Sequence, residues 1–277
     1  MTPADYDFLC RLLRERSGLS LGEGKAYLLE ARLVPLAQSY ALSGLDALVA
    51  ELRTGRDQRL RDAVVEAMTT NETSFFRDRT PFDELRDRLL PDLIEARRTT
   101  RSFRIWSAAA STGQEAYSIA MTLADSFPEL DSWSVEIVAT DIAAAMTERG
   151  RAGLFTTFEV QRGLPVQMLV KYFRQADTQW QVAEPIRRRV RWERANLLED
   201  FRRLGTFDLV FCRNVLIYFT PETKSDVLAR IARQMRPDGA LILGAAETVL
   251  GLTDAFRRDA SCKSAVYRTA PTAVAAR

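Results

Sequence analysis

The chain contains no histidine among its 277 residues. Histidine is the side chain whose ordinary pKa lies nearest neutral pH, and it serves as the base in Ser-His-Asp and Cys-His catalysis. Its absence excludes those catalytic arrangements and every His-ligated metal site. Chemistry in this protein must therefore depend on carboxylates, arginine, lysine, tyrosine or a bound cofactor.

Cysteine is scarce as well. Cys10, Cys212 and Cys262 are far apart and odd in number, which favours a reducing compartment over a disulfide framework or a zinc site. No apolar run approaches the roughly 20 residues that span a bilayer, and the N-terminus has no basic secretion signal. The net charge of +2 gives no general attraction to nucleic acid or membrane. We expect a cytoplasmic protein with no metal, no nucleic-acid partner and no membrane insertion.

The residues that are present form two patterns. Residues 1–78 carry apolar side chains at helical spacing, with turn signals at Ser43-Gly44 and Thr54-Gly55, and predict an all-helical N-terminal domain. Residues 79–277 begin with an amphipathic helix over 82–94 and continue as alternating strands and helices. This alternation predicts an α/β domain with a mostly parallel sheet covered by helices.

Within the second region, three apolar runs are predicted as sheet strands: 135–140, 207–212 and 240–243. Arg236-Pro237-Asp238-Gly239 is interpreted as a turn. The stretch 153–192 fits no simple strand–helix unit. It is interpreted as an inserted β-subdomain, with small antiparallel strands at 179–182 and 189–192.

A turn of small residues, Ala108 to Gly113, joins a short apolar strand to a helix. Small side chains let the backbone approach a ligand closely, and the helix start offers free N–H groups. This is the arrangement of the first βα turn of nucleotide-binding sheets. A dinucleotide fingerprint requires three glycines, whereas only Gly113 is present here. The turn therefore predicts a pocket for a nucleoside without a pyrophosphate.

Two acids flank this turn. Asp141 ends the second predicted strand, where an acid can accept both ribose hydroxyls of an adenosine. The alternative is that Asp141 caps a helix beginning at Ala143. Glu115 lies just beyond the turn, where it could face a ligand's amino group or simply favour the helix dipole.

Other polar residues follow further predicted strands or precede the sheet. Asn196 could read the edge of an adenine or cap a turn, and Asn214 follows strand 207–212 at the expected ligand-binding edge. Tyr218 could line the same pocket or lie in the core. The segment 69–78 contains Phe75, Phe76 and Arg77, which either anchor the helices on the sheet or border the pocket mouth.

Four of these stretches together resemble the CheR family of S-adenosylmethionine-dependent methyltransferases, which esterify glutamates of bacterial chemoreceptors. They are Thr70-Asn71-Glu72-Thr73-Ser74-Phe75-Phe76-Arg77, the run Trp106 to Glu115, Thr140-Asp141-Ile142, and the run Phe211 to Phe219. The resemblance covers nearly the whole chain. It implies a Rossmann-like methyltransferase domain with the inserted β-subdomain, preceded by the helical domain.

The resemblance also implies the site. By matching position, ten residues would contact S-adenosylmethionine or its product S-adenosylhomocysteine: Asn71, Thr73, Arg77, Ala109, Glu115, Asp141, Asn196, Leu197, Asn214 and Val215. Arg77 and Tyr218 would border the reacting methyl group. The partners would be the methylation helices of methyl-accepting chemotaxis receptors, and the protein is expected to be a monomer.

Two departures from the family pattern are visible. The family often has Gly-His-Ser-Glu where this chain has Gly244-Ala245-Ala246-Glu247. Members that bind a receptor's C-terminal pentapeptide carry a glycine-rich loop, whereas residues 174–179 contain no glycine. A pentapeptide-independent enzyme is therefore expected. Candidate basic residues for docking an acidic receptor helix are Lys25, Arg32 and the run Arg187-Arg188-Arg189-Arg191.

Carboxyl methylation agrees with the missing histidine. A substrate glutamate, with a pKa near 4.3, is already ionised at neutral pH, so no general base is needed. Alternatives are methylation of a small molecule or nucleic acid, a dinucleotide-dependent oxidoreductase, and a binding module without turnover. The low net charge and the single glycine disfavour nucleic acid and dinucleotide respectively.

Overall fold

The computed structural model describes residues 1–22 and 24–270. The chain divides into two compact units. The first comprises 1–70 together with 218–224, and the second comprises 71–217 and the remaining chain from Ser225. The domain boundary expected at residue 78 stays a prediction, and residues 71–78 cluster with the second unit.

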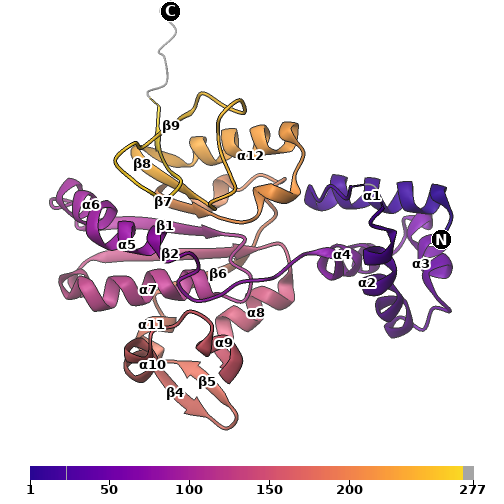
Figure 1. Cartoon of the computed structure of the whole chain (residues 1–277), viewed down its shortest axis with the longest axis horizontal. Helices are drawn as coiled ribbons and strands as arrows, with labels where there is room; N and C mark the ends of the chain where they lie inside the picture. The colour runs from indigo at the N-terminus through magenta and orange to yellow at the C-terminus, as the bar shows by residue number, and fades with distance from the viewer. Residues whose placement is uncertain (23, 271–277) are drawn as a thin grey trace, which may run out of the picture. The chain divides into compact units, whose positions relative to one another are not determined.

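The first unit is built mainly from α1 (Pro3–Ser17), α2 (Ala26–Ser39), α3 (Leu45–Thr54) and α4 (Gln58–Met68) (Figure 1). Thr2 begins α1 with a reciprocal capping box to Asp5, and the Asp57 carboxylate caps α4. The apolar stripes of the helices meet in a core of fully buried leucines: Leu9, Leu13, Leu29, Leu33 and Leu48. Both expected turns separate helices as predicted.

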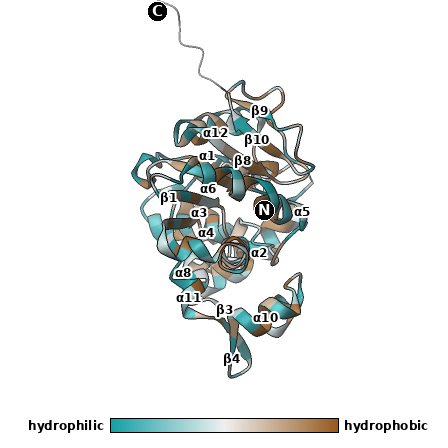
Figure 2. Cartoon of the chain, turned by 90° about the vertical axis from the view of Figure 1, so that its left-hand side faces the viewer, coloured by the Kyte–Doolittle hydropathy of each residue, from teal (hydrophilic) through white to brown (hydrophobic). Residues whose placement is uncertain are grey.

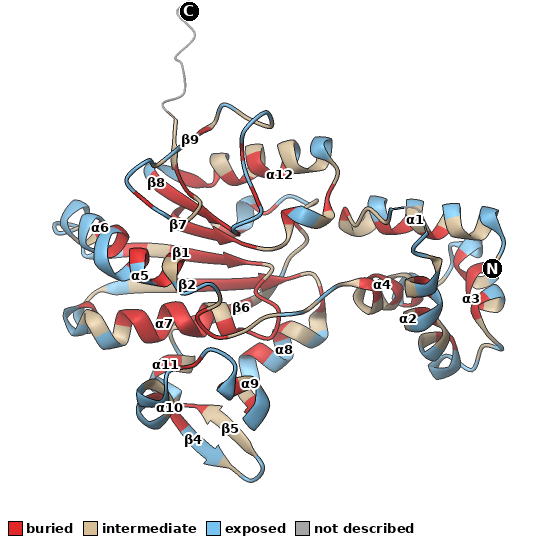
Figure 3. Ribbon diagram, in the orientation of Figure 1, coloured by how far each residue is buried: buried red, intermediate tan, exposed pale blue. Residues whose placement is uncertain are grey.

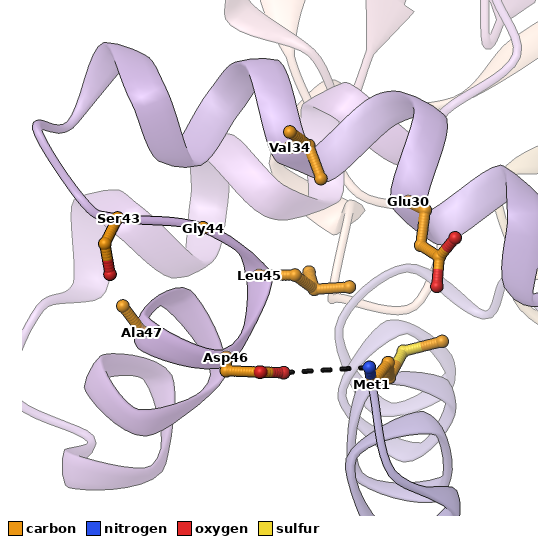
Figure 4. A pocket seen from close by; sticks show the side chains of 8 residues that line it. All are labelled: Met1, Glu30, Val34, Ser43, Gly44, Leu45, Asp46 and Ala47. Atoms are coloured by element: carbon orange, nitrogen blue, oxygen red, sulfur yellow. Dashed lines mark ion pairs between the residues drawn. The ribbon is translucent and has the colours of Figure 1, made fainter.

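A cavity of about 320 Å³ lies in this unit. Figure 4 shows Glu30 and Val34 of α2 on one side of it, across from the segment 43–47 and Met1. The Met1 ammonium lies 3.8 Å from the Asp46 carboxylate. None of the sequence-predicted site residues lines this cavity, so the candidate site lies elsewhere.

The second unit contains a seven-stranded sheet in the order β6-β2-β1-β7-β8-β10-β9. The first five strands are parallel, and β10 and β9 run antiparallel to their neighbours. The strands are β1 (Ser102–Ala108), β2 (Ser134–Asp141), β6 (Val190–Arg194), β7 (Phe207–Cys212), β8 (Met235–Leu243), β9 (Phe256–Arg258) and β10 (Val266–Thr269). The predicted α/β class is confirmed.

Helices cover this sheet, and its strands are largely buried (Figure 3). Phe103 and Ile105 of β1 join a core with α5 (Thr80–Glu84), α6 (Leu90–Ala96) and α7 (Gln114–Ser126). Trp106, whose side chain points to the opposite face, packs against Phe201 and Phe207 with ring centroids 4.9 and 5.4 Å away. Further helices of this unit are α8 (Ala144–Ala152), α11 (Glu184–Arg187) and α12 (Pro221–Arg233).

The inserted subdomain is a small antiparallel sheet in the order β3-β5-β4. Its strands are β3 (Leu154–Thr156), β4 (Phe173–Ala176) and β5 (Gln179–Val182), with α9 (Thr157–Gln161) and α10 (Val166–Tyr172) between β3 and β4. The tip of the β4–β5 hairpin is hydrophilic (Figure 2). The strand expected at 189–192 was placed wrongly in this subdomain. It is β6, which pairs with β2 in the main sheet and buries Trp192.

Two further local expectations need correction. The turn expected at 236–239 is part of β8, as a bulge between the pairs Phe207–Met235 and Leu209–Ala240. The helix expected over 82–94 is real but contains a π-helical turn over Leu85–Leu89. Because Pro91 has no N–H to donate, the regular ladder is interrupted there, and the Leu90 N–H bonds to the carbonyl of Leu85.

Candidate active site

The parallel strands of the second unit end in one row across the sheet. Residue pairing places these five side by side: Glu193, Thr140, Ala108, Cys212 and Leu243. From β1 the chain goes on to β2, toward one edge of the sheet, and from β7 it goes on to β8, toward the other edge. The strand order therefore reverses between β1 and β7, and such a switch point is where open α/β sheets bind ligands. Six predicted cofactor residues lie within three residues of these strand ends: Ala109, Asp141, Asn196, Leu197, Asn214 and Val215.

The turn after β1 has an unusual backbone. Ala109 and Ser111 have φ values of 55° and 51°, in the left-handed region that non-glycine residues seldom adopt, and Gly113 has 102°. Strain of this kind accumulates at functional sites. The space beside Gly113 is occupied by a side chain of the protein. A Cβ there would lie 2.7 Å from the Trp192 ring, which fills the place.

Asp141 holds the turn in this shape. Its Oδ2 accepts the N–H of Ser111 at 2.8 Å, and its Oδ1 accepts the N–H of Ala143 at 2.9 Å. The carboxylate thus joins the ends of β1 and β2, and it is 5% exposed. The helix-capping alternative is partly correct, because Ala143 precedes α8. A carboxylate can accept about four hydrogen bonds, so this role and a ribose contact are compatible.

Glu115 lies in the first turn of α7 beneath the same edge. Ser107 donates its hydroxyl to Oε1 at 2.8 Å, and Arg213 donates Nη1 to Oε2 at 3.1 Å. Burial raises the pKa of Glu115, and the charge of Arg213 opposes that rise. The Glu115 side chain, 13% exposed, is therefore a fixed acceptor paired with a buried cation.

Arg213 lies in one of the four motifs but is not among the predicted site residues. Its side chain is 1% exposed and makes a second ion pair, with Asp78 at 2.8 Å. Its Nη2 also donates to the main-chain carbonyl of Arg77 at 2.9 Å. One guanidinium therefore connects α7, the end of β7 and the backbone of Arg77.

The segment 71–78 is hydrogen-bonded to the turn Ala108–Gly113. The carbonyl of Asn71 accepts the Ser111 hydroxyl at 3.0 Å, and the Arg77 guanidinium donates to the carbonyl of Glu72 at 3.0 Å. Phe75 is fully buried against Phe155 of the subdomain, with ring centroids 4.9 Å apart. The aromatic pair anchors this segment, while Thr73 and Arg77 remain partly exposed.

The turn after β6 contains Asn196 and Leu197. The Asn196 Oδ1 accepts the N–H of Leu198 at 3.0 Å, which is the bond expected of a turn cap. Leu197 is 7% exposed. Arg230 of α12 donates to the carbonyls of residues 197, 198 and 199, which fixes this turn from outside.

The loop after β7 contains Asn214 and Val215, and both donate their N–H groups to the carboxylate of Glu247. Glu247 is not among the predicted site residues, although it follows directly on Ala245 and Ala246. Ala245 and Ala246 are exposed, whereas Glu247 is buried. Tyr218 belongs to the first unit, where its carbonyl accepts the N–H of Ser20 at 2.9 Å.

Most of the candidate docking arginines are internally paired. Arg32 donates to the carbonyls of Met68 and Thr69 at 2.8 and 3.0 Å and so caps α4. In the run from Arg187, Arg188 pairs with Glu184, Arg189 with Asp131, and Arg191 with Glu136. These contacts favour a structural role over a free basic surface.

Neither a metal cluster nor a membrane span is found in the described chain. Within residues 1–22 and 24–270, no three His, Cys, Asp or Glu side chains are grouped to hold a metal ion. Over the same residues, no helix has the length and apolar character needed to cross a membrane.

Two family models match this chain. The CheR methyltransferase all-alpha domain matches residues 4–69, and the CheR methyltransferase SAM binding domain matches residues 71–264. Together they cover both units up to the start of the last strand.

The chain is also similar to relatives of known name and to solved structures. Chemotaxis protein methyltransferase 1 of Vibrio cholerae is 44% identical over 255 residues, 91% of this chain and 92% of the relative. Chemotaxis protein methyltransferase 1 of Pseudomonas aeruginosa is 42% identical over 270 residues, 96% and 97% of the two chains. PKMT2 from Rickettsia typhi in complex with AdoHcy overlaps 63% of this chain and 26% of its own, at 12% identity and a TM-score of 0.38.

Proposed function

We propose, since the chain belongs to the CheR methyltransferase family, that it methylates glutamate side chains of methyl-accepting chemotaxis receptors. Family membership establishes an S-adenosylmethionine-dependent chemotaxis methyltransferase. The receptor and the glutamate acceptor are the proposed part. The observation that carries this part is the 42–44% identity, over most of the chain, to chemotaxis protein methyltransferases. The row of strand ends supports the cofactor part, because six of the ten predicted cofactor residues lie at that edge of the sheet.

The donors and acceptors at this edge suit an adenosine with an amino-acid tail. Asp141 would accept ribose hydroxyls, Asn196 would meet the adenine edge, and Glu115 would meet the tail ammonium. The remaining contacts would come from Asn71, Thr73, Arg77, Ala109, Leu197, Asn214 and Val215. The left-handed backbone at Ala109 supports this assignment, because it turns main-chain groups out of the regular strand pattern.

The chemistry requires no protein base. A receptor glutamate is ionised at neutral pH and is the nucleophile, and the cofactor supplies the activated methyl group together with its leaving group. The protein's task is alignment, an effect that can contribute several kcal/mol. Arg77 would hold the acceptor carboxylate by a forked contact, and Tyr218 would orient it or shield the methyl group from water.

The proposal extends to the setting of the enzyme. The absence of glycine in residues 174–179 and the hydrophilic tip of the β4–β5 hairpin support a pentapeptide-independent member. We propose that it acts as a cytoplasmic monomer on receptor methylation helices, with no nucleic-acid partner and no membrane insertion. Lys25 stays a candidate for docking these helices, whereas the internal bonds of Arg32 make that residue a weaker one.

The acceptor atom can be tested by mass spectrometry. Receptor membranes are incubated with the enzyme and S-adenosylmethionine, and receptor peptides are mapped for the mass of one added methyl group. We expect the methyl group on glutamate side chains only. Methyl groups found on lysine, arginine or a non-receptor molecule would refute the proposal.

The proposed role of Arg77 is tested with Arg77→Ala and Arg77→Lys. Because a lysine cannot make a forked contact, both variants should lose at least about tenfold in kcat/KM for receptor. Calorimetry with S-adenosylhomocysteine separates cofactor binding from acceptor alignment. Undiminished turnover by Arg77→Ala would remove this residue from the mechanism.

A further inference from the structure

The loop after β7 is fixed by one side chain from the end of the neighbouring strand. Glu247 lies four residues beyond β8 and is 7% exposed. Its Oε2 accepts the N–H groups of Gly244 at 2.7 Å and Asn214 at 2.8 Å. Its Oε1 accepts those of Val215 at 3.0 Å and Ile217 at 3.3 Å.

These four bonds saturate the carboxylate. An ionised carboxylate is an acceptor only, with about four lone-pair positions on its two oxygens. Each oxygen of Glu247 holds two N–H groups. A glutamine in this place would keep one acceptor oxygen and turn an NH₂ donor toward the other two N–H groups. The site is therefore built for a negative charge rather than for a polar side chain in general.

The backbone around the carboxylate is shaped for the same contact. Asn214 has a φ of 59°, a left-handed conformation that asparagine adopts more readily than other non-glycine residues. Gly244 completes the fit, because a Cβ there would lie 2.7 Å from Oε2 of Glu247 and 2.9 Å from Nδ2 of Asn214. Ala245 and Ala246, which stand where the family often has His-Ser, are exposed. They take no part in these contacts.

We propose that Glu247 is a positioning residue for S-adenosylmethionine. Its acceptor capacity is used by main-chain N–H groups, so it acts through Asn214 and Val215 rather than on the cofactor itself. It holds their loop in the binding conformation before the cofactor arrives, which removes the entropy cost of ordering the loop on binding. The inference rests on the proposed cofactor role of Asn214 and Val215.

The chain offers a matched control in Glu84. This glutamate is 8% exposed, in the same unit, and its carboxylate also accepts main-chain N–H groups, from Lys263 and from Ser264 at 3.1 Å. The segment it holds carries no predicted cofactor residue. Glu247→Gln and Glu84→Gln therefore disturb similar buried contacts, but only one of them supports the cofactor loop.

Binding of S-adenosylhomocysteine is measured by calorimetry for the full-length wild type and both variants, together with thermal melting. We expect both variants to melt earlier, but only Glu247→Gln to bind at least about tenfold more weakly, a loss of about 1.4 kcal/mol. Glu84→Gln should stay within about twofold of wild type. Equal affinities for Glu247→Gln and wild type, or equal losses in the two variants, would overturn the proposal.

A second variant tests the same contact without removing the charge. Gly244→Ala pushes a methyl group against the carboxylate and should weaken S-adenosylhomocysteine binding in the same direction. Amide exchange of residues 214, 215 and 217 in the ligand-free protein should be faster in either variant. Unchanged exchange would contradict the proposal that Glu247 holds this loop. Since no receptor is present, failure of glutamate methylation would leave this result unaffected.

Discussion

Arg213 is a nearly inaccessible cation that compensates two acids, Glu115 and Asp78, and also holds the Arg77 carbonyl. Removing one partner of a buried ion pair leaves an uncompensated charge and typically costs about 3–5 kcal/mol. Arg213→Met should therefore lower the free energy of unfolding by about that amount, measured by urea titration. Arg98→Met is the control, because the exposed Arg98 side chain makes only a 3.8 Å pair with Glu95. Equal losses of unfolding free energy in the two variants would contradict this role of Arg213 as a buried ion-pair partner.

Gly113 allows a second prediction at the scale of single residues. Gly113→Ala places a methyl group 2.7 Å from the Trp192 ring and also strains the backbone at φ 102°. Gly251→Ala gives the strain alone, because φ there is 72° and nothing lies within 4 Å of the added Cβ. Gly113→Ala should lower the free energy of unfolding, measured with urea, by at least about 1 kcal/mol more than Gly251→Ala does.

The double variant identifies the cause. If the clash with the Trp192 ring causes the loss of stability, Gly113→Ala should lower the free energy of unfolding by less when Trp192 is already replaced by leucine. The coupling energy between the two substitutions should be about 1 kcal/mol or more. Additive effects would show that the ring is not the obstacle.

Sequence reasoning at this scale found residues whose side chains are polar and directly follow strands. Asp141 and Asn214 were predicted in this way, and the structure places both at the sheet edge. Glu247 was missed because its partners are main-chain N–H groups, which leave no signature in side-chain composition. Arg213 was missed because its partners, Asp78 and Glu115, are distant in sequence. An arginine directly after the strand Phe207–Cys212 is the sequence signal that could have found it.

At the scale of elements, the bulge in β8 is fastened by an ion pair. Arg97 donates both terminal nitrogens to Asp238, at 2.7 and 2.8 Å, and its Nε to Asp208 at 2.8 Å. The hydrogen bonds from Arg97 lower the pKa of Asp238 below its ordinary value of 3.8. The bulge therefore depends on the ionised form of this carboxyl group.

The sign of the pH effect follows from that shift. Because the unfolded state binds the Asp238 proton more readily, the stabilisation is complete above the unfolded pKa and is lost as pH falls through the lower, folded one. Asp238→Asn should therefore be less stable than wild type at pH 7, and the difference should shrink below about pH 4. Urea midpoints measured across this range test it, and a difference independent of pH would contradict it.

The elements themselves were predicted unequally. The strand at 207–212 matches β7, since a continuous apolar run between turn signals suffices to identify it. The turn at 236–239 was wrong because Pro and Gly also occur in bulges, and the pairing partner decides between the two. The strand at 189–192 was assigned to the wrong sheet, because local pattern cannot show which strand it will pair with.

At the scale of the whole molecule, receptor engagement should not depend on a C-terminal pentapeptide. The β4–β5 hairpin turn consists of Asp177 and Thr178, and residues 174–179 contain no glycine. Initial methylation rates should agree within about twofold for a receptor with its natural C-terminus and the same receptor lacking its last residues. A large loss on truncation would show that the hairpin binds the pentapeptide after all.

The most direct test of the central claim is the chemical lability of the transferred methyl group. Receptor membranes are labelled with methyl-labelled S-adenosylmethionine by the wild-type enzyme, separated by electrophoresis, and treated with alkali. Carboxyl esters hydrolyse to methanol, so the label in the receptor band should pass into the volatile fraction. Label that stays with the receptor after alkali would not be a carboxyl ester, and would contradict glutamate methylation.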